Sequence, residues 1–139
     1  MRIDGGGADL DAGYAMSQEF GKIKKLYSKL IKRPAILFPN VGQKLKAPDK
    51  QGVYLILSPR KKVVHVGRTL RGRRGIAQRL TNHLHNSSSF TEKYLKGKGS
   101  KLRGKYWFKF IVKKGARTRA LLEAYSVGRL CPKHLGLGD

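Results

Sequence analysis

The chain has 139 residues, with 31 Lys or Arg against 8 Asp or Glu, which gives a formal net charge of +23. This length fits one domain, and a hydrophobic content of 40% argues against wholesale disorder. The single Cys131 excludes both an internal disulfide and a zinc site made of several thiolates. No apolar stretch is long enough to cross a bilayer, and the N-terminus lacks the order of a signal peptide, so we expect a soluble cytoplasmic protein.

The charge is unevenly distributed along the chain. Residues 1–20 contain one base, four acids and a run of three glycines, which predicts a flexible acidic tail. Residues 21–139 keep 30 bases and 4 acids and therefore carry +26. We divide them into a basic N-terminal helix with a connecting segment, 21–50, and a folded domain, 51–139. Such charge predicts a polyanionic partner, and composition alone does not separate nucleic acid from a membrane surface.

The first half of the chain predicts a helix, a connector and a hairpin. Residues 17–32 place apolar side chains at three- and four-residue spacing and lysines on the other face, which indicates an amphipathic helix that Pro34 ends. The lysine face fits solvent and a phosphate backbone equally well. Residues 34–51 are rich in Pro, Gly and Asn and predict a connecting segment. The β-rich runs 52–57 and 62–67, joined by a short turn with Pro59, predict an antiparallel hairpin.

The second half predicts two helices, a loop and a third strand. Ile76, Leu80 and Leu84 mark a helix, and residues 86–105 have the composition of a mobile basic loop. Residues 106–112 alternate as a strand, with Phe108 and Phe110 on one face and Trp107 and Lys109 on the other. A last helix is expected over 116–130. The predicted class is α+β, a small three-stranded antiparallel sheet flanked by helices.

An ordered set of motifs runs through residues 51–132. Arg79 and His83 stand one helical turn apart, so their side chains project to the same region. The set consists of Gly52-Val53-Tyr54, Val66-Gly67 at the end of the next strand, Arg79, His83 and Glu123-Ala124. In this order the motifs resemble the GIY-YIG nuclease family. The resemblance implies a metal-dependent endonuclease that hydrolyses phosphodiester bonds of DNA, and a compact chain of this kind is most like the sequence-specific restriction enzymes.

The resemblance also implies a role for each matching residue. Tyr54 would accept a proton from the attacking water, His83 would assist the nucleophile or shuttle that proton, and Arg79 would stabilise charge on the phosphate. Glu123 would bind one hard divalent cation, Mg²⁺ or another such as Mn²⁺. Without the resemblance, a structural salt bridge is the favoured explanation of Glu123, and core packing explains Tyr54.

Two positions depart from the family pattern. His65 stands where the second motif usually has Tyr, and we count it as a candidate catalytic residue because imidazole also donates and accepts hydrogen bonds. The stretch 131–136 lacks the Asn that usually follows the Glu helix, and His134 is the candidate substitute. These departures leave a second hypothesis open, a non-catalytic nucleic-acid-binding module on the same fold. A ribosomal type of RNA-binding protein fits the charge but leaves the ordered motifs unexplained.

The candidate nucleic-acid-binding residues fall in two basic segments. One follows the predicted hairpin and can hold phosphates or read guanine edges, and the other lies in the predicted loop, where a solvated linker is the alternative. They are Arg68, Arg71, Arg73 and Arg74 in the first segment and Lys96, Lys98, Lys101 and Arg103 in the second. With the resemblance, we expect double-stranded DNA as the partner rather than a membrane. Cutting both strands with one site per chain favours a homodimer, with the N-terminal helix as a candidate interface.

Overall fold

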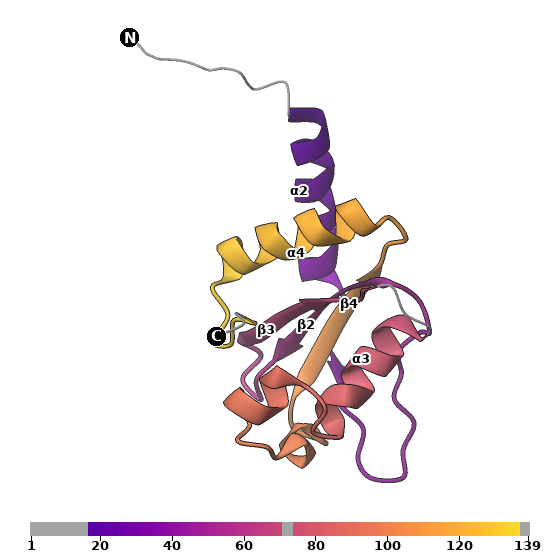
Figure 1. The fold of residues 1–139 in the computed structure, drawn as a ribbon, viewed down its shortest axis with the longest axis vertical. Helices are drawn as coiled ribbons and strands as arrows, with labels where there is room; N and C mark the ends of the chain where they lie inside the picture. The colour runs from indigo at the N-terminus through magenta and orange to yellow at the C-terminus, as the bar shows by residue number, and fades with distance from the viewer. Residues whose placement is uncertain (1–16, 71–73, 137–139) are drawn as a thin grey trace.

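The computed structural model describes residues 17–70 and 74–136. An antiparallel sheet with strand order β1-β4-β2-β3 forms its middle layer (Figure 1). The predicted α+β class is confirmed, but the sheet has four strands rather than three. The elements are α2 (Ser17–Lys32), β1 (Ile36–Leu37), β2 (Gly52–Leu57), β3 (Val63–Arg68), α3 (Gly75–Leu84), the π-helical turn η1 (Phe90–Tyr94), the 3-10 turn η2 (Gly99–Leu102), β4 (Trp107–Val112) and α4 (Ala116–Leu130).

The additional strand lies inside the predicted connecting segment. Ile36 and Leu37 of β1 pair with Phe108 and Trp107 of β4. A strand of two residues is too short for alternation to reveal it, and the prolines on both sides are typical of a connector. Of the predicted acidic tail, residues 1–16 lie outside the described part of the chain, and residues 17–20 form the start of α2.

Each face of the sheet is covered by its own apolar cluster. The central strand β2 is buried at all six positions, which explains why its sequence is a continuous apolar run. On one face α3, η1 and η2 pack against the sheet, and on the other face α2 and α4 pack against it (Figure 1). The first cluster includes Phe38, Ile56, Leu80, Phe90, Leu102 and Phe108, and the second includes Ile23, Leu30, Leu55, Ile111 and Leu122.

The segment 86–105 is not the mobile loop that its composition predicted. Phe90, Leu95 and Leu102 are 0–2% exposed and belong to the cluster beneath α3. Phe90 lies in the π-helical turn, Leu102 lies in the 3-10 turn and Leu95 lies between the two turns. No single helical or strand period therefore connects these apolar residues. The segment is therefore part of the core, and its lysines cover the outer surface.

Strand β4 confirms the predicted alternation and carries the only tryptophan of the sequence. Phe108 joins the cluster on the α3 side, whereas Ile111 and Trp107 contact the cluster on the α2 and α4 side. Trp107 pairs with Leu57 of β2 and Leu37 of β1, far along the sheet from the start of β2. Among the described residues, no helix combines the length and apolar character needed to cross a membrane.

Candidate active site

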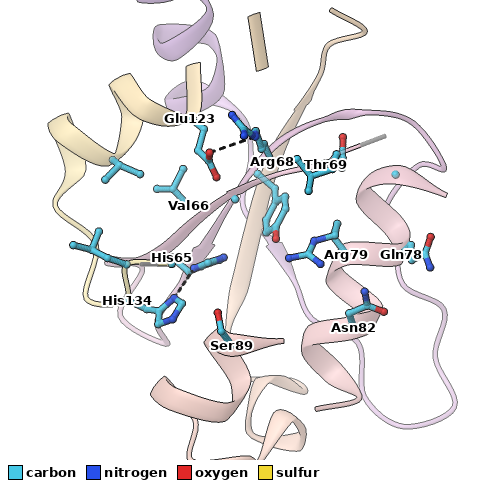
Figure 2. Close-up of a pocket in the computed structure, with 17 residues that line it drawn as sticks. His65, Val66, Arg68, Thr69, Gln78, Arg79, Asn82, Ser89, Glu123 and His134 are labelled. Carbon is cyan, nitrogen blue, oxygen red and sulfur yellow. Dashed lines mark hydrogen bonds and ion pairs between the residues drawn. The ribbon is translucent and has the colours of Figure 1, made fainter. Parts of the chain in front are cut away.

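A cleft of about 1000 Å³ lies along β3, the strand at the edge of the sheet. Helix α3 borders it on one side, and α4 with the C-terminal segment borders it on the other (Figure 2). The cleft therefore opens at the edge of the sheet, between the helices that cover its two faces. Four of the five predicted catalytic residues line it, each from a different element: Tyr54 from β2, His65 from β3, Arg79 from α3 and Glu123 from α4.

Tyr54 forms the floor of the cleft because its cross-strand neighbour has no side chain. It pairs with Gly67 of β3, and a Cβ atom on Gly67 would lie 2.4 Å from both Cζ and Oη of the Tyr54 ring. Glycine at this position thus lets the phenol lie beneath the edge strand. Tyr54 is fully buried, and this burial raises the pKa of its hydroxyl to about 12, although the Arg79 guanidinium acts to lower it. The phenol is therefore protonated at neutral pH.

His83 is the fifth predicted residue and lies behind Tyr54. Its Nε2 atom is 2.7 Å from the Tyr54 hydroxyl, and its Nδ1 atom is 2.6 Å from Oγ of Ser88. Burial lowers the pKa of His83 well below 6.5, and the nearby His65 and Arg79 lower it further. The imidazole is therefore neutral, with one nitrogen that donates a hydrogen bond and one that accepts.

The two departures from the family pattern are in contact with each other. Nδ1 of His65 lies 3.0 Å from Nδ1 of His134, and both residues are 7% exposed (Figure 2). The His134 amide donates to the Val64 carbonyl at 2.9 Å, which fixes the C-terminal segment along β3. Burial lowers the pKa of His65 to about 3 and also lowers the pKa of His134. The two positions that depart from the family pattern thus form one hydrogen-bonded pair.

The other end of the cleft carries charge. Glu123 is the one carboxylate among the described residues that line the cleft, and its Oε1 atom is 3.6 Å from Nε of Arg68 (Figure 2). The two side chains are 29% and 34% exposed. Burial raises the pKa of Glu123, whereas the positive charges of Arg68 and Arg79 lower it. The ion pair is longer than a hydrogen bond and partly solvated, so it is weak and exchangeable.

These residues fit a single divalent cation bound mainly by oxygen atoms that the protein does not supply. In the described part of the chain, no three His, Cys, Asp or Glu side chains come close enough together to bind a metal ion. Glu123 would therefore be the one protein ligand, and its carboxylate oxygens are the hard donors that Mg²⁺ prefers. Water and the oxygens of a phosphate would complete the coordination.

Arg79 fits an anionic ligand. Its Nε atom is buried and has no hydrogen-bond partner, although the guanidinium lines the cleft next to Tyr54. A buried donor without a partner costs about 1–3 kcal/mol, a cost that a phosphate oxygen in the cleft would remove.

The predicted nucleic-acid-binding residues separate into two groups. Arg68 lines the cleft, and the exposed Arg74 pairs loosely with Asp49 at 3.6 Å. Arg71 and Arg73 lie outside the described residues. The second group comes from the segment 86–105, and none of its four residues lines the cleft. Arg103 is partly buried, and the other three are exposed: Lys96, Lys98 and Lys101.

Two residues of the site were not predicted from the sequence. Ser88 and Thr91 form hydrogen bonds with His83 from the segment interpreted as a loop. A run of three serines, 87–89, followed by Phe90 and Thr91 is typical of loop composition, and no spacing in the sequence connects these residues with His83. The contact exists because burial of Phe90 brings this segment back against the end of α3.

No family model and no curated protein matches this chain. Solved structures with a similar arrangement are GIY-YIG N-terminal endonuclease domains of UvrC from Thermotoga maritima. One, a point mutant bound to its catalytic divalent cation, is 18% identical over 84% of this chain and 97% of that domain, with a TM-score of 0.49. Another, bound to magnesium, is 20% identical over 81% of this chain and 93% of that domain, with a TM-score of 0.47. The ordered motifs of this chain resemble the same family.

Proposed function

We propose that this protein is a metal-dependent endonuclease that hydrolyses phosphodiester bonds of DNA. The observation that carries the proposal is the gathering of three chemical functions in one cleft. A phenol hydrogen-bonded to a neutral imidazole can move a proton, an unpartnered guanidinium nitrogen can bind a phosphate oxygen, and a lone carboxylate can bind a cation. Together, these three functions can activate a water molecule and stabilise the charge that develops on the phosphate during hydrolysis.

Tyr54 acts as a proton relay in this mechanism. Since the pKa of Tyr54 is raised to about 12, its side chain is a protonated phenol before the reaction begins. As the water oxygen forms its bond to phosphorus, the water proton passes to the Tyr54 oxygen and the phenol proton passes to Nε2 of His83, 2.7 Å away. The bond from phosphorus to the leaving oxygen breaks, and that oxygen takes a proton from a solvent water molecule. His83 then returns its proton to solvent, and Arg79 stabilises the charge on the phosphoryl oxygens throughout. Glu123 would hold a divalent cation, which would supply further charge neutralisation.

The charge of the chain supports double-stranded DNA as the substrate. The net charge is +23, and Arg68 lies at the cleft where it can exchange Glu123 for a phosphate. We include recognition of DNA by the protein's own loops, as in restriction enzymes, and the basic charge of the chain supports it. We also include a homodimer, because cutting both strands with one site per chain favours two copies. The ion pair between Arg68 and Glu123 favours the second candidate, a binding module without catalysis, because it occupies the carboxylate that the cation needs.

Plasmid cleavage tests the choice between these two functions. We expect wild-type protein to cut plasmid DNA with Mg²⁺ and to stop when EDTA is added. Glu123→Gln should lose about 10²–10³-fold in rate, because the charge that binds the cation is gone while the shape is kept. Glu92→Gln, which removes an exposed carboxylate from outside the cleft, is the matched control.

Two results would contradict the proposal. Cutting that persists both in EDTA and in the Glu123→Gln variant would exclude the metal site. Binding that weakens with salt, with no cutting under any divalent cation, would assign the protein to the non-catalytic module.

A further inference from the structure

The hydrogen bonds behind His83 determine which of its two nitrogens carries the hydrogen. They begin at Thr91, whose hydroxyl lies 2.5 Å from the His83 carbonyl oxygen. A carbonyl only accepts, so the single hydroxyl hydrogen of Thr91 points to it. The Thr91 oxygen can then only accept from its other neighbours. Thr91 is fully buried, so water does not offer it another partner.

Ser88 is that other neighbour. Its Oγ atom lies 3.1 Å from Oγ1 of Thr91 and also accepts from the Thr91 amide at 3.1 Å. The contact between these two hydroxyl oxygens is a hydrogen bond, and Thr91 has already used its own hydrogen. Ser88 therefore donates to Thr91 and has no hydrogen left for His83.

The contact between Ser88 and His83 then has one possible direction. Nδ1 of His83 is 2.6 Å from the Ser88 oxygen, so Nδ1 carries the hydrogen and donates it. In a neutral imidazole the other nitrogen, Nε2, is then without hydrogen and accepts the hydroxyl of Tyr54 at 2.7 Å. The reverse tautomer would leave Ser88 and Thr91 with no hydrogen between their oxygens.

We propose that Ser88 and Thr91 are positioning residues that hold neutral His83 in the tautomer with hydrogen on Nδ1, so that Nε2 stays free to take the proton of Tyr54. The role in catalysis rests on the proposed function, whereas the tautomer itself does not. The groups that face His83 agree with a neutral ring. They are Tyr54 from β2, His65 from β3, Arg79 from its own helix, Phe90 from η1 and His134 from the C-terminal segment.

The relay depends on the packed segment that follows α3. Phe90 is fully buried and contacts the His83 ring with a centroid separation of 5.4 Å. The Gly99 amide donates to the Asn86 side chain at 2.7 Å, and a Cβ atom at Gly99 would lie 2.5 Å from the His83 carbonyl. The backbone that carries Ser88 and Thr91 is thus held against the end of α3 at several points.

Nitrogen-15 NMR of the imidazole rings tests the tautomer directly, without DNA or metal. We expect the His83 resonances of the wild-type protein to show hydrogen on Nδ1. In Thr91→Val, which keeps the buried volume, Ser88 loses its acceptor and can donate to Nδ1, so the hydrogen should move to Nε2. Thr91→Ser keeps the hydroxyl and should restore the wild-type tautomer.

Cleavage of plasmid DNA tests the catalytic consequence. Ser88→Ala should reduce the rate roughly 10- to 100-fold, because a histidine in the wrong tautomer cannot accept the proton. Ser87→Ala is the matched control, since Ser87 is exposed and its hydroxyl bonds only to the His85 carbonyl, at 3.3 Å. The pH dependence of the rate should change in Ser88→Ala and not in Ser87→Ala.

The outcomes separate this inference from the proposed function. Hydrogen on Nε2 in the wild type, or an unchanged tautomer in a folded Thr91→Val, would overturn the inference whether or not the protein cuts DNA. Equal rates for Ser88→Ala and Ser87→Ala in a protein that cuts would overturn the positioning role. A wild-type protein that shows the Nδ1 tautomer but does not cut would overturn the proposed function and leave the hydrogen-bond assignment supported.

Discussion

The two ends of the cleft differ in burial, charge and the kind of contact they make. At one end Tyr54, His65 and His83 are 0–7% exposed, and their pKa values are shifted so that all three side chains are neutral near pH 7. At the other end Arg68 and Glu123 are about one third exposed and form a long ion pair. The first end is built from short hydrogen bonds, and the second from a contact that solvent can replace.

Under the proposed function, this difference predicts that the buried end carries out proton transfer and the charged end binds the substrate and the cation. A proton moves efficiently between neutral groups that are shielded from solvent and lie within hydrogen-bond distance, and burial supplies those conditions. A substrate phosphate or a cation must replace an existing partner, and an exposed ion pair gives way at little cost. We therefore expect substitutions at the buried end to change the rate of the chemical step, and substitutions at the charged end to change binding.

The largest expected effect comes from removing the phenol oxygen. Tyr54→Phe keeps the ring beneath Gly67 but removes the group that, in the proposed mechanism, passes the proton to His83, so the cleavage rate should fall about 10²–10⁴-fold with little change in DNA affinity. Single-turnover cleavage and binding assays on the same DNA measure the two effects. Tyr27→Phe removes a hydroxyl on α2 away from the cleft and is the control. A Tyr54→Phe variant that binds DNA weakly but cuts it at the normal rate would contradict a role of the buried end in the chemical step.

Gly67→Ala should disturb the buried end through packing. A methyl group 2.4 Å from the Tyr54 hydroxyl must displace the ring, so we expect the free energy of unfolding to fall by about 1–3 kcal/mol and cleavage to fall with it. Chemical denaturation measures the stability. Gly21→Ala, at a helical position with open space around it, should instead raise stability by about 0.5–1 kcal/mol. Equal effects of the two substitutions would show that the contact with Tyr54 does not constrain Gly67.

The neutral histidines predict how stability depends on pH. The pKa of His65 falls to about 3 and that of His83 falls well below 6.5, so between pH 6.5 and 3 the unfolded chain binds more protons than the folded one. The free energy of unfolding should therefore decrease as pH falls through this window, by at most about 1.4 kcal/mol per pH unit for each histidine. His65→Gln should show a shallower decrease, measured by denaturation at several pH values. His85→Gln, at an exposed position, is the control, and a steeper decrease in His65→Gln would contradict a buried neutral His65.

The smallest expected effect is at the charged end. Arg68→Ala should lower DNA affinity a few-fold and reduce the slope of log affinity against log salt by about 1, because one phosphate contact is lost. It should also raise the pKa of Glu123, which Arg68 now lowers. Arg60→Ala removes an exposed arginine from the turn between β2 and β3 and is the control. A salt slope that does not change would place Arg68 outside the DNA interface.

Much of the fold was predictable because its longer elements have clear periods. The bounds of α2 agree with the prediction, and those of the last helix agree as well, since both have one apolar face. The run at β2 was recognised as a strand because six residues are buried on both faces. The strand β1 was missed because it is two residues long, and η1 and η2 were missed because turns of five and four residues are too short to show a period.

The site was predictable where ordered motifs carry it and not where tertiary packing does. Tyr54, Arg79 and Glu123 were predicted as one set, and the structure brings them to one cleft. The contact between His65 and His134 joins positions 69 residues apart, and no spacing in the sequence connects them. Ser88 became part of the site only through the burial of Phe90, a contact that no local pattern encodes.

The position of Trp107 gives this protein a built-in optical reporter. The indole belongs to the apolar cluster on the α2 and α4 side and is absent from the lining of the cleft. Its emission should therefore follow unfolding while remaining unaffected by DNA or a cation bound at β3. Denaturation can thus be followed by fluorescence in the presence of ligand, and the stabilisation that each ligand confers can be read without a label. Lys61 lies over the indole ring at 4.5 Å, so its loss would alter that emission in the folded protein.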